Sequence, residues 1–340
     1  MKISMFAYTN SGRGLIERMK AFFEGDEVKM YVPKRLSADG FFVIPDASAP
    51  LYEALFNQSD ALIFAGSCGI AIRCIAPYIR DKRTDPAVLA IDEAGRFVIP
   101  LLSGHIGGAN ALAERIAARS GAAAVITTAT DVRGRFSPDA WAAKNGLIID
   151  DTDAAKAVSA AILERDVPLL CELPVTGGLP AGVYEGESGD VGILIGFTTH
   201  GAPFEKTLRL IPKILRVGIG CKRGTGAERI RAAVSDVFTR EGLDLRAVKC
   251  FATIDMKADE PGLKDYCCAE KKPLEVYSAE ELRAVSGEFE PSDFVKSITG
   301  VDNVCERAAM AGAHRLIVKK TARDGVTVAV AAQYTEVRFE

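Results

Sequence analysis

The chain has 340 residues, enough for two or three domains of ordinary size. Hydrophobic residues make up 48% and charged residues 26% of the sequence, a composition that excludes a disordered or collagen-like chain. Lys and Arg number 42 and Asp and Glu number 45, giving a net charge of -3. This balance argues against a dedicated nucleic-acid-binding protein, because such a protein needs a basic surplus.

The sequence has the features of a cytoplasmic protein. Its longest uncharged run, residues 97–113, is too short and too polar to span a bilayer, and the first dozen residues do not have the pattern of a signal peptide. The eight cysteines show neither CxxC spacing nor a zinc-ligand pattern with histidine. We therefore expect reduced thiols in a cytoplasmic protein, and no metal site.

Charge is distributed unevenly along the chain. Residues 136–212 contain 5 basic against 11 acidic residues, whereas the segments on either side are nearly balanced. This block also contains a Gly- and Pro-rich stretch, residues 174–189, which predicts turns. We expect an N-terminal α/β domain over 1–135, a small middle domain and linker over 136–212, and a C-terminal α/β domain over 213–340. The linker is expected near residues 206–213.

Short β-rich runs alternate with helical patterns in both large domains. In the first domain we expect helices from about residue 13, after residue 69 and over 108–119, and strands over 3–8, 61–65, 87–91, 96–99 and 125–128, with a hairpin joining 87–91 to 96–99. In the last domain we expect a helix over 225–241 and strands over 215–219, 248–254, 274–277 and 326–331. The predicted fold class is α/β: two α/β domains with mostly parallel sheets, joined by a small acidic middle domain.

Ligands of open α/β sheets bind where the carboxyl ends of strands lead into helices, and four segments combine that position with small and polar residues. The first is residues 66–73 (GSCGIAIR). Small residues let a ligand approach the backbone, and a helix start favours anions. The alternative is a tight strand–helix turn with a solvated arginine. The candidate binding residues are Gly66, Ser67, Gly69 and Arg73.

The second segment, residues 100–110 (PLLSGHIGGAN), is the most informative one. His105 is flanked by glycines just before a predicted helix, where it could act as general acid or base while the amides of Gly107 and Gly108 stabilise an oxyanion. Alternatively, its ring caps a backbone carbonyl. His200 and His314 have no such surroundings and are interpreted as structural or solvated. The candidate binding residues are Ser103, Gly104, Gly107, Gly108 and Asn110.

The third segment is residues 127–131 (TTATD), at the end of a predicted strand. Asp131 could orient a histidine, bind water or contact a ligand, or it could cap the next turn. The hydroxyl groups of Thr127, Thr128 and Thr130 are candidates for ligand binding.

The fourth segment, residues 217–225 (VGIGCKRGT), joins a strand to a helix through glycines and two basic side chains, which suits an anion. Its glycine spacing departs from the dinucleotide fingerprint. The candidate binding residues are Gly220, Cys221, Lys222, Arg223, Gly224 and Thr225. Further along, Asp302 is a candidate helix N-cap, and Glu306, in the first turn of that helix, is a candidate catalytic carboxylate.

Four stretches of this sequence resemble the cobalt-precorrin-5A hydrolase (CbiG) family of the anaerobic route to cobalamin. They occur in the family's order and extend over essentially the whole chain: residues 66–117, 125–131 (VITTATD), 217–225 (VGIGCKRGT) and 299–309 (TGVDNVCERAA). The first stretch is highly specific, whereas the glycine loop at 217–225 alone would not suffice.

The resemblance implies a reaction on a cobalt-bearing tetrapyrrole. Water opens the δ-lactone between the ring A acetate and C20, and the C20 fragment leaves as acetaldehyde to give cobalt-precorrin-5B. The cobalt belongs to the substrate, so no cofactor is expected, and neighbouring pathway enzymes are candidate partners. His105 and the glycine amides suit lactone opening, and Asp131 or Glu306 suits proton transfer. Arg73, Lys222 and Arg223 suit the carboxylate arms, in a cleft expected between the two large domains.

Two other functions compete with this interpretation. A corrinoid-binding or carrier protein without catalytic activity would use the same basic loops and glycines. A flavin or nicotinamide nucleotide protein is suggested by residues 9–12 (TNSG) and 218–224, although both matches are short.

Overall fold

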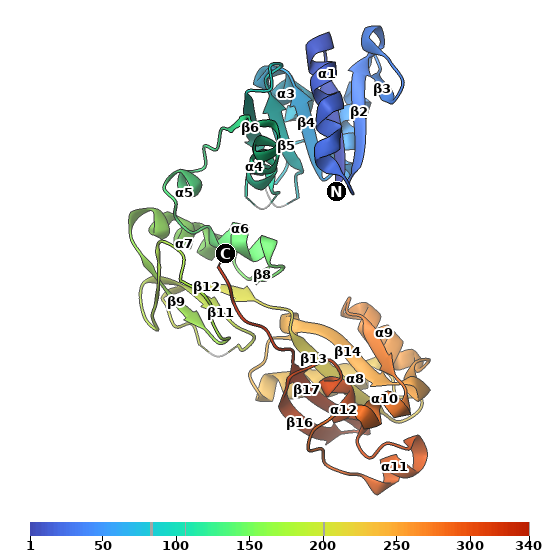
Figure 1. Cartoon of the computed structure of the whole chain (residues 1–340). Coiled ribbons are helices and arrows are strands. Elements are labelled where there is room, and N and C mark those ends of the chain that lie inside the picture. Colours follow the sequence, from blue (N-terminus) through green and yellow to red (C-terminus); the bar gives the residue numbers. More distant parts are fainter. Residues whose placement is uncertain (82–83, 106, 200, 340) are drawn as a thin grey trace. The chain divides into compact units, whose positions relative to one another are not determined.

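The computed structural model describes residues 1–81, 84–105, 107–199 and 201–339. This part of the chain divides into two compact units, Met1–Lys144 and Asn145–Glu340. Its strands form one sheet in the first unit and two in the second, and helices separate many, but not all, of the consecutive strands (Figure 1). The predicted α/β class with mostly parallel sheets is confirmed. The domain boundaries near residues 135 and 212 stay a prediction.

The sheet of the first unit has the strand order β3-β2-β1-β4-β5-β6-β7. Neighbouring strands are parallel except β5 and β6, which form the predicted antiparallel hairpin. The elements of this unit are β1 (Lys2–Ala7), α1 (Asn10–Met19), β2 (Glu27–Pro33), β3 (Phe41–Ile44), α2 (Ala49–Gln58), β4 (Ala61–Ala65), α3 (Cys68–Ile75), β5 (Ala87–Ile91), β6 (Phe97–Leu102), α4 (Ala109–Ser120), β7 (Ala123–Ala124), α5 (Ala129–Val132) and α6 (Pro138–Lys144).

Strand β4 shows why the centre of this sheet is apolar at every position. Ile63 packs into a cluster that includes α1 and α4, whereas Leu62 and Phe64 pack into a second cluster that includes α2 and α3. Helices therefore cover both faces of the strand, as in other parallel sheets. Each fully buried side chain of this kind stabilises the fold by about 1.5–3 kcal/mol. The strand predicted over 61–65 is confirmed.

The predicted strand over residues 125–128 is wrong. Only Ala123 and Ala124 pair with β6, and α5 begins at Ala129. The amide of Val125 still donates to the carbonyl of Val98 at 2.8 Å, but beyond that point the chain leaves the sheet. The β-branched residues of this segment favour a strand by propensity, yet they lie in the loop that carries part of the candidate site.

The second unit begins with a sheet in the order β10-β9-β11-β12-β8. Its elements are β8 (Ile148–Ile149), α7 (Thr152–Glu164), β9 (Val167–Cys171), β10 (Val183–Glu185), β11 (Val191–Ile195) and β12 (Lys206–Ile211). The linker expected near residues 206–213 is wrong, because β12 pairs in parallel with β11 over five residues. Most of the Gly- and Pro-rich stretch is irregular, with a turn at residues 181–182 and the short strand β10 directly after it.

The last sheet has the order β15-β14-β13-β17-β16, in which β13, β14 and β15 are parallel. Its elements are β13 (Leu215–Cys221), α8 (Ala227–Arg240), β14 (Val248–Ile254), α9 (Pro261–Ala269), β15 (Leu274–Tyr277), α10 (Ala279–Ala284), α11 (Asp293–Thr299), α12 (Val304–Met310), β16 (Arg315–Arg323) and β17 (Val326–Ala332). All four strands predicted here are present, and the predicted helix corresponds to α8. No helix in the described ranges is both long and apolar enough to cross a membrane.

Candidate active site

Backbone hydrogen bonds tie the described residues of the loop between β6 and α4 to the start of that helix. The amide of Ala109 donates to the carbonyl of Ser103 at 3.1 Å, and that of Asn110 donates to the carbonyl of Gly104 at 3.0 Å. A Cβ at Gly107 would lie 2.3 Å from the Cβ of Ser103, so only glycine fits there. The Gly108 amide donates to the carbonyl of His105 at 3.0 Å. This amide is therefore not available as the oxyanion donor expected from the sequence.

The structure brings His105 and Asp131 together, which is one of the roles that the sequence leaves open for Asp131. Nε2 of His105 lies 3.0 Å from Oδ2 of Asp131. The side-chain amide of Asn110 donates to the same oxygen at 2.7 Å and to the hydroxyl of Thr128 at 2.9 Å. The hydroxyl of Thr130 lies 3.4 Å from Nε2 of His105. Two predicted segments, after β6 and before α5, thus form one hydrogen-bonded cluster.

Two side chains at the start of α6, Ser137 and Asp139, complete this cluster and were not predicted. Oγ of Ser137 lies 2.9 Å from Nδ1 of His105 and donates to Oδ1 of Asp139, also at 2.9 Å. That carboxylate oxygen lies 3.8 Å from Nδ1. The Ser-Pro-Asp sequence at 137–139 is a recognisable helix start, and it is the signal by which these two residues could have been found.

The two carboxylates determine the electrostatics of His105. Its pKa is raised above the usual value first by the nearby carboxylate of Asp139 and then by that of Asp131, although burial opposes the shift. Exposed fractions differ strongly: 17% for the His105 side chain, 12% for Asp139 and 39% for Asp131. Asp131 is therefore the member of the cluster most accessible to a ligand.

The raised pKa of His105 predicts that the stability of the first unit depends on pH. The protonated imidazole contributes stability that is fully present below the pKa of an unfolded histidine, about 6.5, and is lost as pH rises through the higher pKa in the fold. We expect the free energy of unfolding to fall across this window less steeply in His105→Gln than in the wild type. Urea unfolding at a series of pH values, followed by the fluorescence of Trp141, the single tryptophan, measures the free energy of unfolding. Equal slopes in both proteins would contradict the expectation.

The segment at 66–73 lies at the other edge of the same sheet. The amide of Gly66 donates to the carbonyl of Ile91, at the end of β5. Strand β6 runs antiparallel to β5, so its end pairs near the start of β5, where the hydroxyl of Ser103 donates to the carbonyl of Asp85. The His105 cluster is thus at the edge where the parallel strands begin. The two loops, both predicted as binding segments, therefore lie at opposite edges of this sheet.

The predicted binding residues Ser67, Gly69 and Arg73 belong to helix α3 or to its N-cap. Ser67 caps α3 by accepting a hydrogen bond from the amide of Ile70 at 3.4 Å. Gly69 lies in the first turn of this helix, and Arg73 in its last turn is exposed. Thr127, in the loop before α5, is exposed as well.

In the second unit, the loop after β13 presents two exposed basic side chains, Lys222 and Arg223. The amide of Gly224 donates to Oε1 of the buried Glu260 at 2.5 Å, and the hydroxyl of Thr225 donates to the carbonyl of Lys222 at 2.7 Å. These groups fold the loop onto α9. At the end of the strand, a Cβ at Gly220 would lie 2.5 Å from the hydroxyl of Thr327, and burial raises the pKa of Cys221.

Glu306 lies in the first turn of α12, as predicted, but it is 1% exposed. Its carboxylate accepts hydrogen bonds from the amide of Lys320 at 2.6 Å, the amide of Glu290 at 3.2 Å and the side chain of Asn303 at 2.6 Å. The N-cap of α12 is Asn303, whereas Asp302 forms an ion pair with Arg307, so the N-cap role expected for Asp302 is wrong. These contacts make Glu306 an anchor for three segments of the second unit.

Replacing Glu306 with alanine is expected to destabilise the second unit by about 3 kcal/mol or more, because three donors lose their buried acceptor. Urea unfolding followed by far-ultraviolet circular dichroism measures the loss. The matched control is Glu280→Ala at the exposed start of α10, which is expected to change stability by about 0.5 kcal/mol at most. A loss as small as that of the control would contradict an anchoring role.

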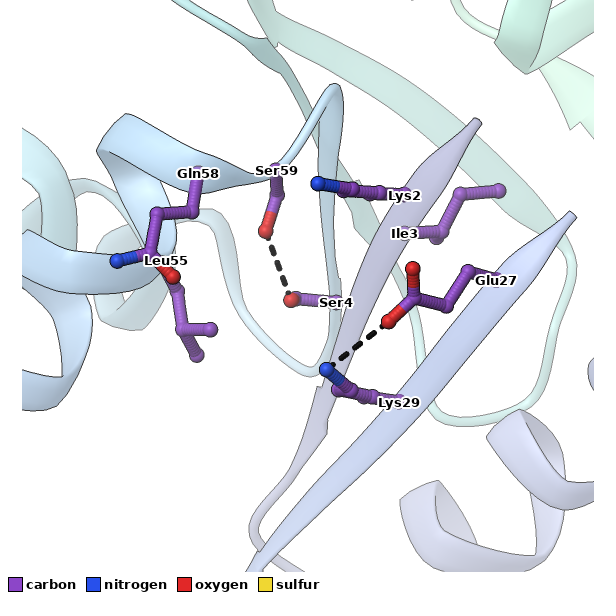
Figure 2. A pocket seen from close by; sticks show the side chains of 8 residues that line it. All are labelled: Lys2, Ile3, Ser4, Glu27, Lys29, Leu55, Gln58 and Ser59. Atoms are coloured by element: carbon purple, nitrogen blue, oxygen red, sulfur yellow. Dashed lines mark hydrogen bonds and ion pairs between the residues drawn. The ribbon is translucent and has the colours of Figure 1, made fainter.

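A hollow of about 90 Å³ lies near the beginnings of β1 and β2, and its lining residues are shown in Figure 2. Lys29 pairs with Glu27 at 2.9 Å, and the hydroxyl groups of Ser4 and Ser59 lie 2.9 Å apart. Its polar groups are thus largely paired with one another. Of the remaining histidines, His314 is exposed and packs edge-on against Tyr334, and His200 lies outside the described residues.

Comparison with known proteins agrees with the resemblance. The family model "Cobalamin synthesis G N-terminal" matches residues 50–131, and "Cobalamin synthesis G C-terminus" matches residues 215–331. The chain is 32% identical to the cobalt-precorrin-5A hydrolase of Salmonella typhimurium, over 96% of each protein. It is also 32% identical to that of Priestia megaterium, over 92% of this chain and 87% of the relative. A probable cobalt-precorrin-5A hydrolase of Methanocaldococcus jannaschii is 28% identical, over 82% of this chain and 87% of the relative.

The two family models together match more than half of the chain, and the Salmonella relative matches almost its whole length. The His105 cluster lies at the end of the first matched region, whereas Ser137 and Asp139 lie between the two regions. On this evidence, the chain belongs to the cobalamin synthesis G family.

Proposed function

We propose that this chain is a cobalt-precorrin-5A hydrolase of cobalamin biosynthesis. It opens the ring A δ-lactone of cobalt-precorrin-5A and releases the C20 fragment as acetaldehyde, which gives cobalt-precorrin-5B. The relatives that are similar over most of the chain carry this activity in their names, which supports the reaction. The structural observation that supports it is the contact of His105 with the accessible carboxylate of Asp131.

Lactone opening needs a group that takes a proton from water while the water oxygen bonds to the carbonyl carbon. The same step breaks the bond between that carbon and the ring oxygen, which then needs a proton. His105 and Asp131 are in hydrogen-bonding contact and are both titratable, so the pair suits both transfers. For Glu306, burial and three internal donors favour an anchoring role over a reacting one.

The acetate and propionate arms of a corrinoid are anionic, so we propose that exposed basic side chains bind them. Arg73, Lys222 and Arg223 are exposed and suit this role. The cobalt is part of the substrate, and the proposal includes no cofactor bound by the chain itself. The proposal also includes a cytoplasmic location, as predicted from eight cysteines that show neither CxxC spacing nor a zinc-ligand pattern.

The experiment is incubation of the purified protein with cobalt-precorrin-5A, with acetaldehyde trapped and the corrinoid product analysed by mass spectrometry. We expect aldehyde and opened lactone in equal amounts. Tight stoichiometric binding with an intact lactone and no aldehyde would contradict the proposal and would favour a corrinoid carrier.

A further inference from the structure

The two oxygens of Asp131 have different surroundings. Oδ2 receives both donors, His105 and Asn110, at 3.0 and 2.7 Å. Among the residues that the structure describes, none donates to Oδ1. The side chain as a whole is 39% exposed and its protein donors occupy Oδ2, so Oδ1 is the oxygen left for water. Asp131 is thus held by one oxygen and presents the other.

His105 has the opposite character, since protein groups occupy both of its ring nitrogens. Nε2 faces Asp131, and Nδ1 faces Oγ of Ser137. The single hydroxyl proton of Ser137 serves one acceptor at a time, and Asp139, a buried carboxylate, lies 2.9 Å away. When Ser137 donates to Asp139, its oxygen accepts a proton from Nδ1 of His105. Both ring nitrogens then carry protons, which is the imidazolium form.

The charges around the ring favour this form. Among the described residues, the charged groups that face His105 are Asp131 on α5 and Asp139 on α6, and Thr130 and Ser137 face it as neutral hydroxyl groups. In the imidazolium form both ring N–H groups have an acceptor, Nε2 in Asp131 and Nδ1 in Ser137, and a carboxylate lies on each side of the charge. The raised pKa of His105 agrees with this geometry.

We propose that Asp131 is the catalytic residue of this site, and that His105, Ser137 and Asp139 are positioning residues that hold it. This assignment rests on the proposed function. Oδ1 of Asp131 takes a proton from water as the water oxygen bonds to the lactone carbonyl carbon. The bond from that carbon to the ring oxygen then breaks, its electron pair stays on the departing oxygen, and the proton on Oδ1 passes to that oxygen. The carboxylate is restored, and His105 keeps its protons throughout.

The first test compares two replacements of His105. The amide of glutamine can still donate to Oδ2 of Asp131 but cannot accept a proton, whereas alanine can do neither. We expect His105→Gln to retain at least roughly tenfold more aldehyde-releasing activity than His105→Ala, because a positioning role needs only a donor. If His105 is itself the proton acceptor, both variants lose activity equally, and that result would overturn the assignment.

The second test needs no substrate. The chain contains three histidines, so ¹⁵N-labelled imidazoles can be followed individually by NMR, with His105 assigned from its loss in His105→Gln. We expect its titration midpoint to lie above that of an ordinary histidine and to move to lower pH in Ser137→Ala and Asp139→Asn. Asp139→Glu keeps a carboxylate at this position, and its titration midpoint for His105 is expected to lie between those of the wild type and Asp139→Asn. An unmoved midpoint in folded variants would overturn the positioning role of Ser137 and Asp139.

The two tests separate this inference from the proposed function. If the wild-type protein releases no aldehyde, the proposed reaction fails, and the NMR titration still decides whether Ser137 and Asp139 hold a protonated His105. If aldehyde is released and the two His105 variants are equally inactive, the reaction stands and the division of roles is wrong.

Discussion

The Asp131→Asn variant is expected to lose roughly 10²–10⁴-fold in kcat for aldehyde release while its fold is kept. Asparagine has nearly the same size as aspartate, and its side-chain oxygen can still accept hydrogen bonds from His105 and Asn110. It cannot take a proton from water at neutral pH. Steady-state kinetics measures the loss, and the fluorescence of Trp141 reports on the fold of the first unit.

Asp39→Asn is the matched control, because it removes the same charge from an exposed position in the same unit. We expect this control to keep the kcat of the wild type. A kcat for Asp131→Asn within about threefold of the control would show that another group takes the proton.

The Gly218→Ala variant is expected to destabilise the second unit by about 3 kcal/mol or more. Helix α12 lies directly on β13 at this glycine, where a Cβ would be 1.8 Å from the carbonyl oxygen of Cys305 and 2.8 Å from the amide of Ala309. Both are backbone atoms, so relief requires the helix to move away from the sheet. Urea unfolding followed by far-ultraviolet circular dichroism measures the change.

Gly178→Ala serves as its control, because this glycine is exposed and a Cβ there meets nothing within 4 Å. We expect the control to change stability by about 0.5 kcal/mol at most. A similarly small effect for Gly218→Ala would mean that α12 is not seated on β13 as described.

Strands that are buried on both faces were the most predictable part of this fold. The bounds of β4, β5 and β14 agree with the sequence prediction, because their largely apolar runs end at polar or turn-forming residues. Strand β2 was not predicted, since its charged residues Glu27 and Lys29 interrupt the apolar pattern. In the structure those two side chains pair with each other beside the hollow.

The candidate site could be predicted only where strand neighbours determine it. Strands β6 and β7 are parallel neighbours, so the loops that follow them meet and bring His105 to Asp131. From the sequence, orienting a histidine is only one of several roles open to Asp131. The predicted hairpin of β5 and β6 already implies that the loop after β6 lies at the edge opposite the Gly66 loop. The contact with Ser137 depends on the path of the chain after α5, for which the sequence contains no periodic signal.

The reversal of β6 separates two polar loops of one domain by the length of a strand. Strand β5 has five residues, and at about 3.3 Å per residue its two ends lie roughly 17 Å apart. Mutations in the loop that contains Ser67 and in the loop that contains His105 therefore act on non-adjacent surfaces, and their energetic effects should be additive. A substitution in the loop that contains Ser67 is therefore expected to leave the contacts of His105 unchanged.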